Sequence, residues 1–164
     1  MSSRRSFAIP ALLLAACAAT SPTRGPEAQL EREYAEIVAG FLRGDPEPWI
    51  SRLTPEFTLK LFSGSDRSRK WVVEYVRNNA RVFTIDTLSM SILEITPVET
   101  GVVVRVRQTS SRHFRDEAGQ LQKLDVDAIQ LEEWTRLEGR WMLRHVTESE
   151  VIQVKTEPVP AGTR

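Results

Sequence analysis

The sequence predicts an α+β domain in which N-terminal helices pack on a curved, mostly antiparallel sheet. Between residues 27 and 43, apolar residues recur at the three- and four-residue spacing of an amphipathic helix. From Val82 onward the spacing changes to the two-residue alternation of strands, which continues through four long segments. The connections between these segments are short and contain glycine, which predicts antiparallel neighbours.

The length and composition fit one globular domain. The chain has 164 residues, within the range of about 100–200 that a single domain takes. Apolar residues make up 41% and charged residues 27%, which excludes the disordered, collagenous and coiled-coil classes. Basic and acidic residues number 22 each, and removal of residues 1–16 takes away Arg4 and Arg5, leaving 20 against 22. Such a balance gives no basic patch for nucleic acid, and we expect no nucleic-acid partner.

The first 17 residues, MSSRRSFAIPALLLAAC, have the pattern of an export signal. Two arginines precede an apolar run at 7–16, and ten residues are too few for a transmembrane helix, which needs about 20. The segment LAAC at 14–17 resembles the bacterial lipobox. This resemblance implies that residues 1–17 are a lipoprotein signal peptide and that Cys17 is lipidated. The alternative is an ordinary secretory signal with an incidental cysteine.

The same segment predicts the compartment. Residues 3–7 (SRRSF) resemble the core of a twin-arginine signal, although paired arginines also occur in Sec signals, so both export routes stay open. Ala18 stands where an aspartate is associated with inner-membrane retention, which implies the periplasmic side of the outer membrane in a Gram-negative host. We therefore expect a lipid-anchored protein of the cell envelope. Because Cys17 is the only cysteine, the lipidated protein would have no thiol for a disulfide or a metal site.

Composition also sets the expected domain boundaries. Residues 18–26 (AATSPTRGP) are small, polar and proline-bearing, as in a flexible linker. The end of the chain has the same character, and we expect a disordered tail at 156–164. The folded domain is therefore predicted at 27–155.

The first half of this domain is predicted to be largely helical. A helix at 27–43 ends at Gly44, and a second, short helix at 48–53 is broken by Thr54 and Pro55. Alternation predicts a strand at 57–61, followed by a turn at 63–66. A third helix follows, and its apolar positions share one face: Trp71, Val72, Tyr75, Val76 and Ala80.

The second half is predicted as a meander of four strands at 82–96, 101–114, 121–137 and 140–154. This order of elements resembles the nuclear transport factor 2-like superfamily, the cone-shaped, cystatin-like fold of SnoaL-like and ketosteroid-isomerase-like proteins. The resemblance is carried by GF at 40–41, WI at 49–50, FTL at 57–59, WVVEYV at 71–76 and, most specifically, the hairpin EWTRLEGRWML at 133–143. It implies a conical pocket between sheet and helices, and homodimers through the convex face of the sheet.

Two strands supply the candidate pocket residues. On 101–114, the valines at 102, 104 and 106 share a face with Gln108 and Ser110, which could orient a polar group of a ligand near the mouth of the cone. On 121–137, Gln130, Glu132 and Trp134 share a face with Leu124, Val126 and Ala128, and are further pocket candidates. Ile129 and Leu131 on the other face suggest a bulge or burial on both sides, which leaves the side-chain phase open. The alternative for this second set is a dimer face or a rim.

His145 is the best catalytic candidate. By alternation it shares a face with Trp141, Leu143 and Thr147, which is expected to point inward, where a histidine can act as an acid or base. The alternative is a buried histidine satisfied by a neighbouring side chain. His113, at a strand end, is expected to be exposed.

Carboxylates and phenols offer a second type of chemistry. An isomerase-like site needs a carboxylate base and donors for an enolate. The candidates on the predicted strands and helices are Asp86, Asp125, Asp127 and Glu132 as acids, with Tyr34 and Tyr75 as donors. The alternative is that these acids face solvent and these tyrosines edge the core. The four tryptophans are expected in the core.

No cofactor or metal is expected. Two histidines 32 residues apart without a cysteine do not form a ligand cluster, and the sequence has neither a glycine-rich phosphate loop nor a nucleophilic serine motif. The leading functional hypothesis is a membrane-tethered domain that binds a small apolar ligand or an envelope partner. The alternatives are an enzyme of the isomerase, cyclase or dehydratase type, using a pocket histidine and carboxylate, and a structural dimerisation module.

Overall fold

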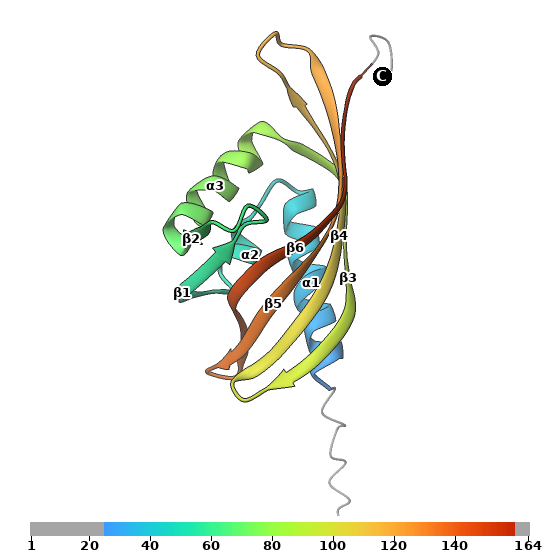
Figure 1. Ribbon diagram of the computed structural model, residues 1–164. Coiled ribbons are helices and arrows are strands. Elements are labelled where there is room, and N and C mark those ends of the chain that lie inside the picture. The colour runs from blue at the N-terminus through green and yellow to red at the C-terminus, as the bar shows by residue number, and fades with distance from the viewer. Residues whose placement is uncertain (1–24, 160–164) are drawn as a thin grey trace, which may run out of the picture.

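The computed structural model of the chain describes residues 25–159, and the expected signal peptide with Cys17 lies outside them. Three helices and six strands occur in this range, and the helices lie on one side of a single curved sheet (Figure 1). The strand order is β2-β1-β6-β5-β4-β3, and every neighbouring pair is antiparallel except β1 with β6. The predicted α+β class and the mostly antiparallel sheet are confirmed.

The first helix, α1 (Pro26–Leu42), forms as the apolar spacing predicted. A proline in its first turn starts it, and it buries Leu30, Tyr34 and Ile37 against the sheet. Gly40 allows the next helix to approach, since a Cβ there would lie 2.7 Å from Cγ of Pro48. The chain then turns at Gly44, whose φ of 74° is a conformation that glycine adopts without strain.

The second helix is shorter than predicted. It spans Glu47–Ile50 as α2, and β1 (Leu53–Lys60) begins where the sequence suggested a helix end. The reason is pairing with β6: the Leu143 N–H donates to the Arg52 carbonyl at 2.7 Å, and Leu53 pairs with Leu143. The pairing is irregular between Leu53 and Thr58, and the segment there contains Pro55, which has no N–H for a ladder bond.

A short strand, β2 (Asp66–Ser68), leads into α3 (Arg69–Val82). Ser68 caps this helix, because its hydroxyl accepts the Trp71 N–H. The predicted apolar face is only partly correct. Val72 and Val73 are buried, whereas Trp71 and Tyr75 stack on each other near the surface, 38% and 50% exposed.

The four remaining strands are β3 (Thr84–Val98), β4 (Gly101–Arg115), β5 (Leu121–Leu137) and β6 (Arg140–Pro158). β6 continues past the expected boundary at residue 155, because its end pairs with the start of β5, Pro158 opposite Gln122. The β4–β5 pairing has no irregularity, whereas β6 carries an extra residue opposite β5 at Arg144, Ser149 and Ile152. Such bulges increase twist and bending, which agrees with the curvature of the sheet in Figure 1.

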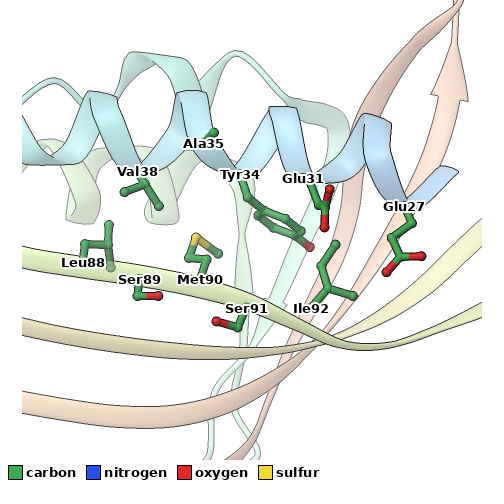
Figure 2. Close-up of a pocket in the computed structure, with 10 residues that line it drawn as sticks. All are labelled: Glu27, Glu31, Tyr34, Ala35, Val38, Leu88, Ser89, Met90, Ser91 and Ile92. Carbon is green, nitrogen blue, oxygen red and sulfur yellow. The ribbon is translucent and has the colours of Figure 1, made fainter. Parts of the chain in front are cut away.

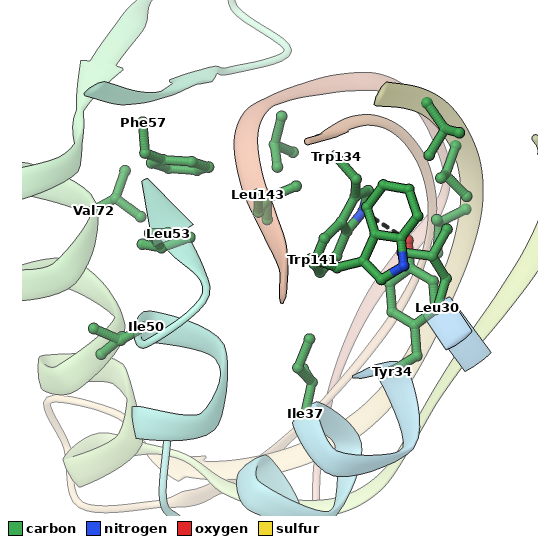
Figure 3. Packing of buried hydrophobic residues seen from close by; sticks show 14 of the residues in the cluster. Leu30, Tyr34, Ile37, Ile50, Leu53, Phe57, Val72, Trp134, Trp141 and Leu143 are labelled. Atoms are coloured by element: carbon green, nitrogen blue, oxygen red, sulfur yellow. Dashed lines mark hydrogen bonds between the residues drawn. The ribbon is translucent and has the colours of Figure 1, made fainter. Parts of the chain in front are cut away.

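The core lies between α1 and the end of the sheet at which the β3–β4 and β5–β6 hairpins turn. Phe57, Trp134 and Leu143 are each at most 2% exposed there, and Trp141 is 7% exposed. Figure 3 shows Trp134 and Trp141 side by side above Leu30 and Tyr34 of α1. The expected core role holds for these two tryptophans. Neither of them packs at the opposite end of the sheet.

Candidate functional site

A partly open cavity of about 410 Å³, the inner cavity, lies between the inner face of the sheet and helices α1 and α3. Its apolar lining comes from both layers. The sheet contributes Leu59, Ile85, Leu88, Met90, Val126, Ala128, Ile129, Val146, Val151 and Val154, and the helices with their ends contribute Ile37, Phe41, Trp49, Val72, Val76, Ala80 and Phe83. A mostly apolar concavity with a few polar groups is the usual form of a small-molecule site.

Three of the predicted pocket residues line this cavity: Gln108, Ser110 and Gln130. Gln108 and Ser110 continue the inward row of β4 after Val102, Val104 and Val106, each at most 4% exposed. The predicted phase of β4 is therefore correct. Val106, which faces inward, pairs directly with Gln130 of β5. The inner face of β5 therefore carries Gln130, Glu132 and Trp134.

The strand pattern also puts a residue in the cavity that the sequence interpretation missed. Arg112 follows Ser110 at the two-residue spacing of β4 and lines the same cavity. Its Nη2 donates to the Ser110 hydroxyl at 3.0 Å, and its Cζ lies 5.6 Å from the Phe83 ring centre. Continuing the alternation of β4 by one step would have found it.

The other two candidates, Glu132 and Trp134, belong to the packed core, 0% and 2% exposed. Oε2 of Glu132 accepts the Tyr34 hydroxyl at 2.6 Å and the Trp134 indole N–H at 2.7 Å, and Oε1 accepts the Gln130 amide at 2.5 Å. Neither residue is among those that line the cavity. The sequence named Tyr34 and Glu132 as candidates, but it carried no signal that they are partners.

The buried network determines the charge of its members. Burial raises the pKa of Glu132 above its usual value, while the hydrogen bonds from Tyr34, Trp134 and Gln130 act in the opposite direction. Burial and the neighbouring Glu132 also raise the pKa of Tyr34, so its hydroxyl keeps its proton and donates. All three donors hold this carboxyl group inside the core, and Glu132 is not among the residues that line the cavity.

The location predicted for His145 needs correction. The extra residue at Arg144 reverses the alternation of β6, so Leu143 pairs with the inward Trp134 while His145 pairs with Glu133 on the outer face. His145 Nδ1 lies 2.7 Å from the Thr58 hydroxyl, and Nε2 lies 2.9 Å from the Thr147 hydroxyl. The histidine is thus satisfied by neighbouring hydroxyls on the outer face, away from the cavity.

The second histidine also lies on the outer face, at the far end of β4. His113 Nδ1 is 2.5 Å from Oδ2 of Asp86, and both side chains are partly exposed, 28% and 39%. Asp125 and Asp127 are in ion pairs there, with Lys123 and Arg107. The carboxylates that the sequence proposed for an isomerase-like site are therefore dispersed over the outer face and the core.

A second concavity, of about 460 Å³, lies between α1 and the edge strand β3 (Figure 2). Glu27, Glu31 and Tyr34 line it from the helix, and residues 88–92 line it from the strand. Its acidic rim and its position at the sheet edge separate it from the inner cavity, although Leu88 and Met90 contribute to both.

Within residues 25–159, no group of three or more histidine, cysteine, aspartate or glutamate side chains could hold a metal ion. In the same range no helix is long and apolar enough to span a membrane.

No protein-family model matches the chain, and no curated protein matches it. Solved structures do. A type 2 hexachlorocyclohexane dehydrochlorinase (LinA) superposes with a TM-score of 0.64 and 12% identity, over 82% of this chain and 89% of that one. A nuclear transport factor 2-like protein from Cytophaga hutchinsonii gives 0.60 and 14% over 74% and 95%, and a ketosteroid isomerase-like protein from Erwinia carotovora atroseptica gives 0.56 and 14% over 81% and 95%.

These matches confirm the predicted fold: the chain has the nuclear transport factor 2-like architecture. The neighbours include enzymes as well as proteins of unknown function, such as one from Shewanella oneidensis. At such identities the likeness concerns the fold alone, and one fold hosts many functions. The function has to be argued from the cavity.

Proposed function

We propose that this chain is a lipid-tethered binding domain of the cell envelope whose inner cavity takes a small, largely apolar molecule. The observation that carries the proposal is the cavity itself. Its volume of about 410 Å³ falls in the range of roughly 300–1,000 Å³ that is usual for small-molecule sites. Burial of an apolar ligand there would remove the exposed apolar lining of the cavity from water, which favours binding.

The arrangement of side chains favours binding over catalysis. An enzyme using a histidine and a carboxylate in the pocket would need both groups within hydrogen-bond reach of one bound molecule. His145 and His113 lie on the outer face, and the buried Glu132 already accepts three hydrogen bonds. The dehydrochlorinase and the ketosteroid isomerase-like neighbours share the fold with this chain, but the inner cavity of this chain does not bring a histidine and a free carboxylate together.

The tether remains part of the proposal on the strength of the sequence. Residues 1–17 resemble a lipoprotein signal, and the folded range begins with α1 at Pro26, eight residues after Ala18. A linker of this length would keep the domain close to the membrane that holds the lipid on Cys17. A cavity near a membrane has access to the apolar molecules dissolved in it.

The test is a titration with N-phenyl-1-naphthylamine, a neutral apolar probe whose fluorescence rises in an apolar environment. The protein is the full chain carrying Cys17→Ser, so that no lipid and no detergent compete for the probe. We expect saturable binding at one site. Absence of binding would contradict the proposed function.

A pair of matched variants locates the probe. Ala128 lines the cavity, and Ala128→Trp should fill part of it and weaken probe binding at least tenfold. Ala118 is exposed in the connection between β4 and β5, so Ala118→Trp adds the same side chain outside the cavity and should leave binding unchanged. Equal affinities of the two variants would show that the probe binds elsewhere, for example on the apolar leader.

The expected homodimer is a separate proposal. The outer face of the sheet carries ion pairs such as Arg107 with Asp127. Sedimentation equilibrium of the same Cys17→Ser protein would show a mass of twice the chain if the outer faces of two copies pair.

A further inference from the structure

Arg112 gives the inner cavity a positive charge that no carboxylate among the described residues neutralises. It is the sixth residue of the inward row of β4, and it lines the cavity beyond Ser110. Ser110 is 6% exposed, and its hydroxyl accepts a hydrogen bond from Nη2 of Arg112 at 3.0 Å. The guanidinium is thus held in place at the cavity wall by a buried hydroxyl.

The remaining donors of Arg112 are not used by the protein. Nε is buried and has no acceptor among the described residues, and Nη1 makes no hydrogen bond with them. No carboxylate in the described part of the chain forms an ion pair with this arginine, and its Cζ lies 5.6 Å from the centre of the Phe83 ring. Burial lowers the pKa of Arg112, although Tyr75 nearby acts in the opposite direction. A partly buried charge without a counterion is unfavourable, and an anion would relieve it.

Carboxylates do line the cavity, but they lie at a distance along the sheet. Glu148 pairs with Gln130, which pairs with Val106, six residues before Arg112 on β4. At roughly 3.3 Å per residue, the position of Glu148 across the sheet is about 20 Å from that of Arg112, measured along the strand. Glu148 also accepts the Phe62 N–H, and Glu150 lies 3.8 Å from Arg105. The cavity is therefore electrostatically asymmetric, with the positive end at Arg112.

We propose that the ligand is an amphipathic carboxylate whose head group binds the free donors of Arg112 beside Ser110, while its apolar part occupies the cavity. An arginine can donate two parallel hydrogen bonds to a carboxylate, here from Nε or Nη1 together with the second hydrogen of Nη2, an interaction that a neutral head group cannot reproduce. Gln108, one step further along the same row, offers an amide to the same head group. This inference rests on the proposed function, since it names the chemical class that the same cavity binds.

The test compares two competitors that differ only in the head group. Dodecanoate and dodecanol are each used to displace N-phenyl-1-naphthylamine from the full-length Cys17→Ser protein. We expect dodecanoate to displace the probe at about one tenth of the dodecanol concentration, because the acid can accept charge-assisted hydrogen bonds from the guanidinium that the alcohol accepts only weakly. Equal displacement by the acid and the alcohol would overturn the carboxylate proposal while leaving the proposed function intact.

Arg112→Met keeps an unbranched, apolar side chain and removes the charge. In this variant the preference for dodecanoate should disappear, with the affinities for dodecanol and the probe retained within about threefold. Arg115→Met is the matched control, because Arg115 lies on the same strand but is exposed and donates to the Gly119 carbonyl. The control should keep the preference. If Arg112→Met also kept it, Arg112 would not be the anion site.

Arg112→Lys guards against a failure of the methionine variant to fold. Lysine retains the charge but loses the paired donors, so the preference should fall without vanishing. An unchanged preference in Arg112→Lys would contradict paired recognition by the guanidinium. If the Cys17→Ser protein without further substitutions binds no probe and no dodecanoate, both this inference and the proposed function fail.

Discussion

The hydroxyl of Tyr34 donates a 2.6 Å hydrogen bond to Glu132, which lies 98 residues later in the chain, and this bond joins helix α1 to strand β5 inside the core. The Trp134 indole N–H reaches the same carboxyl oxygen, and the rings of Tyr34 and Trp134 meet edge to face with centres 5.7 Å apart. A buried carboxylate is tolerated only where donors replace the water it has lost. The three partners therefore depend on one another.

Tyr34→Phe removes one donor and keeps the ring. We expect the free energy of unfolding to fall by about 1.5–3 kcal/mol, the usual contribution of a hydrogen bond to a charged group. Urea denaturation followed by tryptophan fluorescence measures it. Tyr75→Phe is the control, because Tyr75 is 50% exposed and stacks on Trp71, and its loss should stay within about 0.5 kcal/mol. Equal losses of unfolding free energy in the two variants would show that the buried Tyr34 hydroxyl contributes no more to stability than the exposed Tyr75 hydroxyl.

Glu132→Gln removes the charge and can keep the network. Its amide oxygen can accept from Tyr34 and Trp134, and its NH₂ can donate to Gln130 once that amide turns over. We expect the variant to fold and to be at least as stable as the wild type at pH 8, since a buried charge is replaced by a neutral group. Glu132→Ala, which leaves three buried donors without an acceptor, should be strongly destabilised.

The wild-type protein and Glu132→Gln should differ in the dependence of stability on pH. Because burial raises the pKa of Glu132, the folded protein binds a proton that the unfolded chain has already released above about pH 4.3. Stability from this group is therefore complete at lower pH and is lost as the pH rises through the folded pKa, by at most about 1.4 kcal/mol per pH unit. Unfolding measured from pH 4 to 8 should show this loss relative to Glu132→Gln. A constant difference across that range would contradict it.

Arg52 makes a comparable connection between the first two helices. Its side chain is buried, and Nε donates to Glu33 at 2.5 Å while the two terminal nitrogens bond Glu36 and the Pro48 carbonyl. A lysine has one compact ammonium group and cannot reach three acceptors with this geometry. Arg52→Lys should therefore lower the free energy of unfolding by about 1–3 kcal/mol.

The control for that prediction is the exposed pair of Arg77 with Glu47, at 2.7 Å. Both side chains are about half exposed, and Arg77→Lys should lower the stability by less than about 1 kcal/mol. Chemical denaturation of both variants under identical conditions makes the comparison. A larger loss in Arg77→Lys than in Arg52→Lys would contradict the role given to burial.

The sequence predicted the parts of the fold that follow a regular period. The spacing of α1 holds because one face of a straight helix packs on the sheet, and the face of β4 holds because its pairing with β5 is unbroken from Gly101 to Arg115. The same regularity extends to Arg112, which the sequence interpretation did not name as a pocket candidate. The candidate site was therefore predictable along β4, where three of its polar residues lie.

Bulges and long-range partners were not predictable in this way. The extra residue at Arg144 reverses the faces of β6, and no glycine or proline marks the position. Thr54 and Pro55 read as a helix end because local composition does not show that β6 is available as a pairing partner for β1. The bond between Tyr34 and Glu132 depends on how the helix crosses the sheet, which a two- or four-residue period does not contain.

The bulge at Arg144 leads to a prediction that separates the cavity from the outer face. Because His145 contacts Thr58 and Thr147 on the outer face, His145→Ala should leave the affinity for N-phenyl-1-naphthylamine within about twofold of the unsubstituted protein. Its stability should fall by about 1 kcal/mol, since two side-chain hydrogen bonds on a partly exposed face are lost. A tenfold loss of probe affinity, comparable to that of Ala128→Trp, would mean that His145 does face the cavity and would favour the histidine-dependent enzyme over the binding domain.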